Sequence, residues 1–82
     1  MNNNINLEWD NRNDFTYSKL VTSQPEVTYL RLLEAANYIY DNRILLRSKK
    51  LNMVSRLKNV QKENKDSREI YLLMRDSYNS II

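Results

Sequence analysis

The 82-residue sequence contains no glycine, no cysteine and no histidine, and its single proline is Pro25. Phosphate-binding loops, dinucleotide fingerprints and nucleophile elbows are excluded, because each needs glycine where the backbone approaches a ligand or takes positive φ. Disulfides are excluded too, and zinc and most transition-metal sites lose their commonest ligands. The ten acidic residues are scattered and show no calcium-loop spacing. We therefore expect no metal and no cofactor.

The same absences argue against an enzyme. Serine and cysteine nucleophile arrangements lose their usual base or nucleophile when histidine and cysteine are missing. Catalysis by carboxylates alone would need a sheltered pocket, which a chain of this size can hardly enclose. Glu8 with Asp10 and Asp66 with Glu69 have no partner base, and the second pair is better explained as a helix cap. We expect no catalytic residues and no small-molecule substrate.

No targeting or membrane-spanning segment is evident in the sequence. The N-terminus, Met1 to Asn4, lacks the basic start and the apolar run of a signal peptide. The longest apolar run, Ile44 to Leu46, is far too short to cross a bilayer. We expect a cytoplasmic protein, which fits the lack of cysteine. Twelve asparagines, with frequent lysine, isoleucine and tyrosine, indicate an AT-rich coding sequence and hence a low-GC bacterium or one of its mobile elements.

The chain is long enough for one small domain, residues 1–82, with a thin core, because a chain of this size buries only roughly 60% of its surface. Its first part, residues 1–23, is a polar arm rich in asparagine. Apolar and polar residues alternate on both sides of a turn-forming segment at 10–14, which permits a short β-hairpin. We favour the alternative, an irregular arm that docks its aromatic residues onto helices, because an isolated hairpin is only marginally stable in water.

A helix is predicted to start after Ser23. This serine and Glu26, three residues later, form a capping box, and Pro25 lies in the first turn, where its missing N–H does no harm. From there to about residue 63, apolar side chains recur every seven residues. A coiled coil needs a second apolar position in each repeat of seven, and here Arg43 and Lys50 occupy that position. The pattern therefore indicates a helix with one apolar seam and not a clean coiled coil. The seam consists of Leu32, Ile39, Leu46, Met53 and Val60.

The segment 24–63 can form one long helix or two helices, with a break near Asp41 and Asn42 or near residues 48–50. Unbroken, it would be about 60 Å long, far longer than a compact chain of this size needs. Either the helix breaks and folds back, or a second copy covers its seam.

A last helix is predicted over residues 66–82, where Asp66 and Glu69 repeat the capping pattern after a turn. A short connection should place it antiparallel to the preceding helix. The predicted fold is mainly α: a helical hairpin of a long helix, or a collinear helix pair, with a C-terminal helix and the N-terminal arm. Because the seam has more surface than the last helix can cover, we also expect a homodimer. The apolar face of the last helix consists of Ile70, Leu73, Met74, Ser77, Tyr78 and Ile81.

Charge is unevenly distributed along the chain. Residues 43–62 carry +7 with no acidic residue, against −3 for residues 1–41 and −1 for residues 63–82. Such a block is typical of a solvated helix face, or of one paired with acids of the last helix. It can also bind an acidic protein or follow nucleic-acid phosphates. In the nucleic-acid case, the contacts are expected from Arg43, Arg47, Lys50, Lys58 and Lys62.

Aromatic side chains form the other candidate binding surface. We expect Trp9, Phe15 and Tyr17 of the arm, with an exposed Tyr38, to contact a partner protein, because aromatic anchors are enriched in interfaces. The alternative for Trp9 is a place in the core. We favour a non-enzymatic interaction protein that binds and modulates, most simply by inhibition, a host or cellular protein. This role would suit the product of a phage or other mobile element. The alternatives are a dimeric nucleic-acid-binding protein and a structural assembly component.

Overall fold

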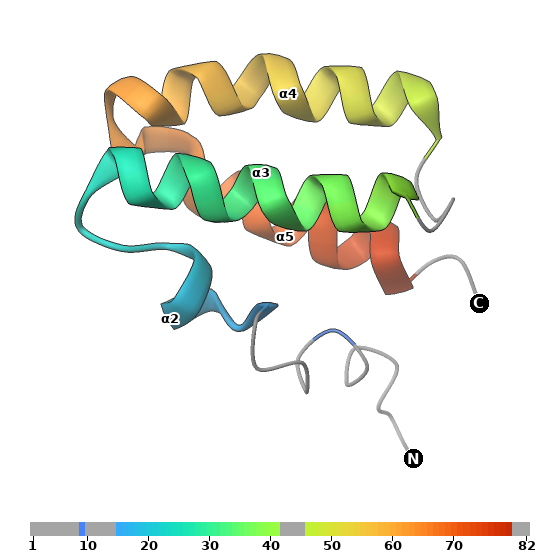
Figure 1. Cartoon of the computed structure of the whole chain (residues 1–82), viewed down its shortest axis with the longest axis horizontal. Helices are drawn as coiled ribbons and strands as arrows, with labels where there is room; N and C mark the ends of the chain where they lie inside the picture. Colours follow the sequence, from blue (N-terminus) through green and yellow to red (C-terminus); the bar gives the residue numbers. More distant parts are fainter. Residues whose placement is uncertain (1–8, 10–14, 42–45, 80–82) are drawn as a thin grey trace.

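The computed structural model describes residues 9, 15–41 and 46–79, and the mainly helical fold predicted from the sequence is confirmed there (Figure 1). No strand occurs in these ranges. Tyr17 and Lys19, which a short hairpin would place in its second arm, lie in a single turn of helix. The first arm of that hairpin lies outside the described residues. The elements are α2 (Tyr17–Leu20), α3 (Pro25–Asp41), α4 (Arg47–Lys62), the 3₁₀ turn η2 (Asn64–Asp66) and α5 (Ser67–Asn79).

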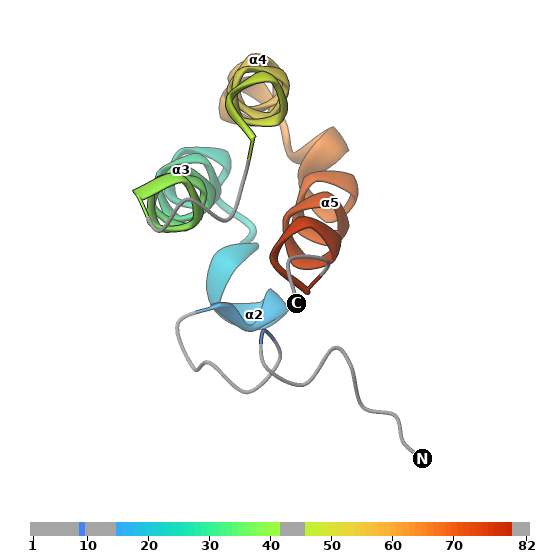
Figure 2. The same ribbon diagram turned by 90° about the vertical axis from the view of Figure 1, so that its right-hand side faces the viewer.

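The three longer helices form an antiparallel bundle. Viewed end-on, α3, α4 and α5 occupy the corners of a triangle, and α2 lies across the open side between α3 and α5 (Figure 2). The most extensive contact joins α3 to α4, and α5 packs against both. As predicted from the short connection, α5 runs antiparallel to α4 (Figure 1). None of the described helices combines the length and the apolar character needed to cross a membrane.

The heptad seam is buried inside one chain. The helix ends at Asp41, in the first of the two predicted break regions, and α4 starts at Arg47 and folds back along α3. Four seam side chains are therefore fully buried, whereas Leu46, just before α4, is 68% exposed. A second copy is not needed to cover this seam, so the homodimer stays a prediction that requires another surface. The fully buried seam residues are Leu32, Ile39, Met53 and Val60.

The start of α3 is held by two threonines and not by the predicted Ser23 cap. The helix begins at Pro25, and the hydroxyl of the buried Thr28 accepts a hydrogen bond from the Thr22 backbone N–H at 2.8 Å. The same hydroxyl donates to the Thr22 carbonyl oxygen at 3.1 Å. That carbonyl also accepts a bond of 2.7 Å from the side-chain amide of Asn64 in η2. The connection before α3 is thus tied to the connection between α4 and α5.

Aromatic side chains close the open side of the bundle. The Trp9 indole is fully buried and stacks on Phe15 with ring centroids 4.4 Å apart. On its other sides Trp9 approaches Tyr78 at 5.3 Å and Tyr71 at 6.1 Å. Leu20 of α2 is 3% exposed and joins the same core. The described part of the arm therefore docks onto the helices, as the favoured interpretation of the sequence required.

Helix α5 buries most of its predicted apolar face, and Tyr71 is buried in addition. Ile70, Met74 and Tyr78 are buried, and Tyr71, which the periodicity left off this face, is buried as well because the arm aromatics cover it. Asp66 lies in η2, and Glu69 forms an ion pair with Arg56 of α4, with Nη1 and Oε1 3.0 Å apart. The predicted second capping box is thus replaced by a helix-to-helix ion pair. Of the other predicted face residues, Ser77 is buried, Leu73 is half-buried and Ile81 lies outside the described residues.

Candidate functional site

The four side chains predicted to bind a partner divide into two groups. Trp9 and Phe15 belong to the core, with exposed fractions of 0% and 5%, so Trp9 offers no surface to a partner in this conformation. Tyr17 is 36% exposed and Tyr38 is half-buried rather than fully exposed. Phe15 and Tyr38 nevertheless come together, because their rings meet edge to face at 5.2 Å.

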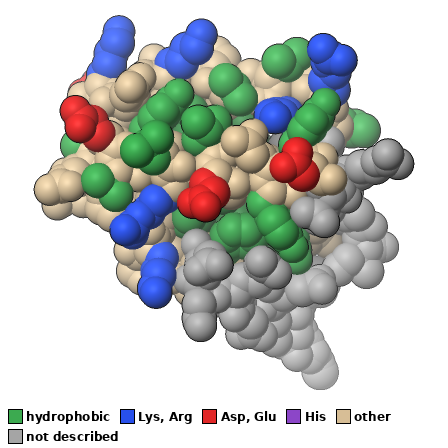
Figure 3. Space-filling view, viewed as in Figure 1, with side chains coloured by type: hydrophobic (Ala, Val, Ile, Leu, Met, Phe, Trp, Pro, Cys, Tyr) green, Lys and Arg blue, Asp and Glu red, His purple; other side chains and the backbone are tan. Residues whose placement is uncertain are grey.

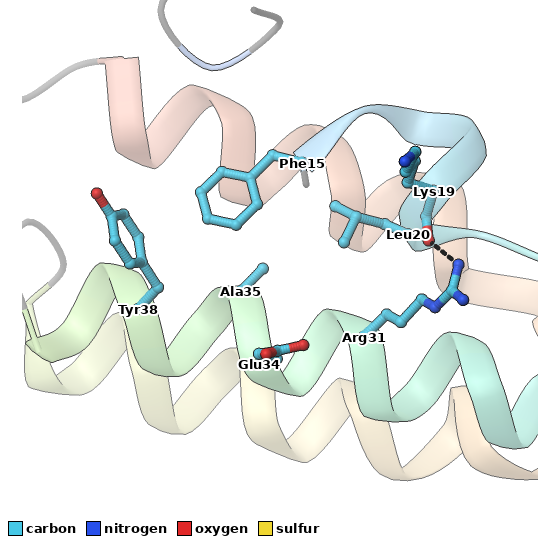
Figure 4. Close-up of a pocket in the computed structure, with 7 residues that line it drawn as sticks. All are labelled: Phe15, Lys19, Leu20, Arg31, Glu34, Ala35 and Tyr38. Carbon is cyan, nitrogen blue, oxygen red and sulfur yellow. Dashed lines mark hydrogen bonds between the residues drawn. The ribbon is translucent and has the colours of Figure 1, made fainter. Parts of the chain in front are cut away.

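Phe15 and Tyr38 line a pocket between α2 and α3, which we call the α2–α3 pocket (Figure 4). Its volume is about 390 Å³. Phe15, Leu20 and Ala35 supply apolar walls, and the Tyr38 ring closes one end. The complete lining is Phe15, Lys19, Leu20, Arg31, Glu34, Ala35 and Tyr38.

The rim of the pocket carries charges of both signs. Lys19, Arg31 and Glu34 are exposed; Lys19 and Arg31 lie at the end away from Tyr38, and Glu34 lies beside Ala35 (Figure 4). The guanidinium of Arg31 donates to the Lys19 carbonyl oxygen at 2.6 Å, which fastens α2 to α3 across the pocket. Because this bond uses the Lys19 backbone, the Lys19 ammonium stays available at the rim.

Packing behind the pocket fixes the position of its walls. Trp9 stacks against Phe15, and Leu20 is buried at the end of α2. The single turn of α2 is closed by backbone hydrogen bonds from Lys19 and Leu20 to the Thr16 carbonyl, 2.9 and 3.0 Å long. The pocket walls are therefore parts of the core and need no ligand to form.

Tyr17 lies apart from the pocket. Its ring meets Tyr71 edge to face at 5.2 Å, and the guanidinium of Arg68 lies 5.6 Å from its centroid. Of the four predicted partner-binding residues, two thus share one pocket, one supports the pocket from behind and one lies on a separate part of the surface.

The sequence analysis missed the charged rim of the pocket and Ala35, the small residue in its apolar wall. Arg31, Ala35 and Tyr38 are spaced by four and three residues, so they share one side of α3. This spacing was a usable signal. It could not show that Phe15 and Leu20 of the arm would face that side, because the docking of the arm follows no period in the sequence.

The residues predicted to contact phosphates lie mostly on the exposed side of α4. Arg47, Lys58 and Lys62 are exposed, and no described carboxylate lies within 4 Å of their charged groups. Lys50 is half-buried, with its ammonium 3.9 Å from the centroid of the Tyr40 ring. Arg43 lies outside the described residues. The alternative pairing with acids of the last helix occurs at Arg56, through Glu69.

Comparison with known proteins adds no relative: no protein-family model, no curated protein and no solved structure matches this chain. Within the described ranges, no three acidic side chains come together as they would around a metal ion.

Proposed function

We propose that this protein acts by binding another protein, and that the α2–α3 pocket receives a large apolar side chain of that partner. The supporting observation is the meeting of Phe15 and Tyr38 in one preformed pocket with a charged rim. A desolvated apolar pocket inside a polar rim is the usual anatomy of an interface hot spot. Burying one large side chain there contributes about 1.5–3 kcal/mol, and the rim charges orient the segment that carries it.

The effect on the partner would be steric. A bound three-helix bundle covers the partner surface around the inserted side chain, which modulates the partner and in the simplest case inhibits it. We propose a host or cellular protein as the partner, and the product of a phage or other mobile element as the kind of protein that would act in this way.

The test is affinity capture from a low-GC bacterial lysate, with and without nuclease, followed by mass spectrometry. We expect one protein that is retained in stoichiometric amount after nuclease treatment. Its retention should be reduced by Tyr38→Ala, which removes an end wall of the pocket, and by Lys19→Glu, which reverses a rim charge without removing the backbone acceptor of Arg31.

Two matched variants control this experiment. Tyr29→Ala shortens another half-buried tyrosine of α3 that does not line the pocket, and Lys49→Glu reverses an exposed lysine on α4. Both should retain the partner, and all four variants should keep the helical circular dichroism spectrum. Equal retention by Tyr38→Ala, Lys19→Glu and the wild type would rule out the pocket as the binding site.

A nucleic-acid-binding protein is the second candidate, supported by the exposed cations Arg47, Lys58 and Lys62 on one side of α4. Its affinity for duplex DNA should fall steeply with salt. The double variant Arg47→Glu/Lys58→Glu should weaken binding to all sequences alike and lower the salt slope by about 1 for each phosphate that is no longer neutralised. Binding that persists unchanged in this variant, or a captured protein that survives nuclease, would argue against it.

A further inference from the structure

One side of the bundle carries opposite charges on two neighbouring helices. In Figure 3, acidic side chains lie along α3, with basic side chains at its lower edge, and basic side chains lie along α4, with hydrophobic side chains between the two helices. The acidic row consists of Glu26, Glu34 and Asp41, and the basic row of Arg47, Lys58 and Lys62. All six residues are exposed. We call these two rows, with the side chains between them, the α3–α4 face.

The two rows match in length. Glu26 and Asp41 are 15 residues apart, as are Arg47 and Lys62, so each row spans about 22 Å at 1.5 Å per residue. Within each helix the charged ends point in nearly the same direction, because an offset of 15 residues at 100° per residue leaves a rotation of only about 60°.

Each row also presents one leucine to solvent. Leu30 lies four residues after Glu26 and is 61% exposed, while Leu51 lies four residues after Arg47 and is 60% exposed. Half-buried Leu33 and Val54 lie on the same two helices. The other helices cover the opposite side of the α3–α4 pair (Figure 2). The face therefore combines apolar surface with charge rows of both signs, which is the composition of a binding surface.

We infer that the α3–α4 face binds a second copy of this chain. A two-fold axis parallel to the helices places α3 of one protomer opposite α4 of its partner, and the two helices are then antiparallel. The antiparallel arrangement brings Glu26 to the partner's Lys62 and Asp41 to the partner's Arg47. Both protomers make the same contacts, and each exposed leucine lies between the two charged ends of its row.

The charge pattern selects a second copy over other occupants. Nucleic acid and anionic lipid would meet the acidic row of α3 as well as the basic row of α4, and like charges face to face are unfavourable. A uniformly acidic protein would meet the same repulsion. A second copy gives every charge at the ends of the two rows an opposite charge.

This inference does not depend on the α2–α3 pocket. Glu26, Leu30 and Asp41 do not line the pocket, and Arg31, Ala35 and Tyr38 line it from another side of α3. Glu34 belongs to both the pocket rim and the acidic row, so it is left unchanged in both tests. Loss of dimerisation and loss of partner capture can therefore be observed separately.

The experiment measures mass in solution by sedimentation equilibrium across micromolar concentrations. One variant makes both rows basic (Glu26→Lys/Asp41→Lys), and the other makes both rows acidic (Arg47→Glu/Lys62→Glu). We expect the wild type to form dimers, and each variant alone to raise the dimer dissociation constant at least about tenfold, because like rows then face each other. An equimolar mixture of the two variants should form heterodimers, because each row again meets its opposite. Leu51→Ser should weaken the dimer without changing the monomer fold.

A matched control reverses two exposed cations outside the face, through Lys49→Glu/Arg68→Glu, and should dimerise like the wild type. Circular dichroism shows that each variant is folded. A wild type that stays monomeric, that forms oligomers larger than a dimer, or whose two charge variants fail to associate on mixing would overturn the inference.

Discussion

The indole of Trp9 lies against the ring of Phe15, with centroids 4.4 Å apart and ring planes inclined by 30°. Stacked aromatic pairs contribute about 0.5–1.5 kcal/mol beyond the area that they bury. The pair joins two functions of the arm. Trp9 packs in the core against α5, and Phe15, which stacks on Trp9, forms part of the wall of the α2–α3 pocket.

Replacing Trp9 with alanine should therefore destabilise the whole domain. We expect a loss of about 3–5 kcal/mol, which is typical of large aromatic truncations in a core, and a fall in helicity. Urea unfolding followed by circular dichroism measures the loss, since Trp9 is the only tryptophan and fluorescence disappears with it. Trp9→Phe should lower the free energy of unfolding by less than Trp9→Ala does, because a ring remains to stack on Phe15. An unchanged unfolding midpoint for Trp9→Ala would contradict the placement of Trp9 in the core.

Thr28 should be needed for its hydroxyl and not for its shape. Thr28→Val keeps the side-chain volume but leaves the Thr22 backbone N–H without its acceptor, so we expect a loss of about 1–3 kcal/mol. Thr28→Ser keeps the hydroxyl and should lower the free energy of unfolding by less than Thr28→Val does. Urea unfolding followed by tryptophan fluorescence compares the two, and a valine variant at least as stable as the serine variant would contradict this account.

Leu46 should be a position where the protein can be stabilised. It is the N-cap residue of α4, with extended backbone at φ −65° and ψ 148°, it makes no side-chain capping bond, and the first turn contains no acidic residue. Aspartate there can accept from the free N–H groups and interacts favourably with the helix dipole, so Leu46→Asp should gain about 0.5–2 kcal/mol. Leu46→Ala provides the comparison in thermal unfolding. A gain of the same size for alanine would show that capping is not the cause.

Regular patterns in the sequence predicted the helices, and irregular contacts escaped prediction. The heptad spacing through Leu32, Ile39, Met53 and Val60 indicated a buried seam, and all four are fully buried. The same spacing could not distinguish a seam covered by a second copy from one that folds back on itself, because the period is identical on both sides of the break. Leu46 belongs to the same repeat but is 68% exposed, because it lies where the helix is interrupted.

The candidate site was harder to predict from the sequence than the helices, because it is formed by tertiary contacts. Phe15 and Tyr38 were both predicted as binding residues, but their meeting depends on how α2 crosses α3, which local propensity does not determine. Arg31 and Lys19 contact each other through a backbone oxygen, and such contacts leave no trace in a sequence pattern. The exposed cations of α4, by contrast, were visible as a block in the sequence and lie on its outer side, except for Arg56 and Lys50.

The hydrogen bond from Asn64 to the Thr22 carbonyl joins residues that are 42 positions apart in the chain. A contact of such long sequence separation closes a large loop, and the entropy of that closure is lost before the bond forms. We expect the α3–α4 hairpin to assemble first from its nearer contacts and the junction of Asn64 with Thr22 to form late. Substitutions at this junction should then accelerate unfolding and leave the folding rate almost unchanged. The end of the bundle that holds both connections would be the last part to fold and the first to open.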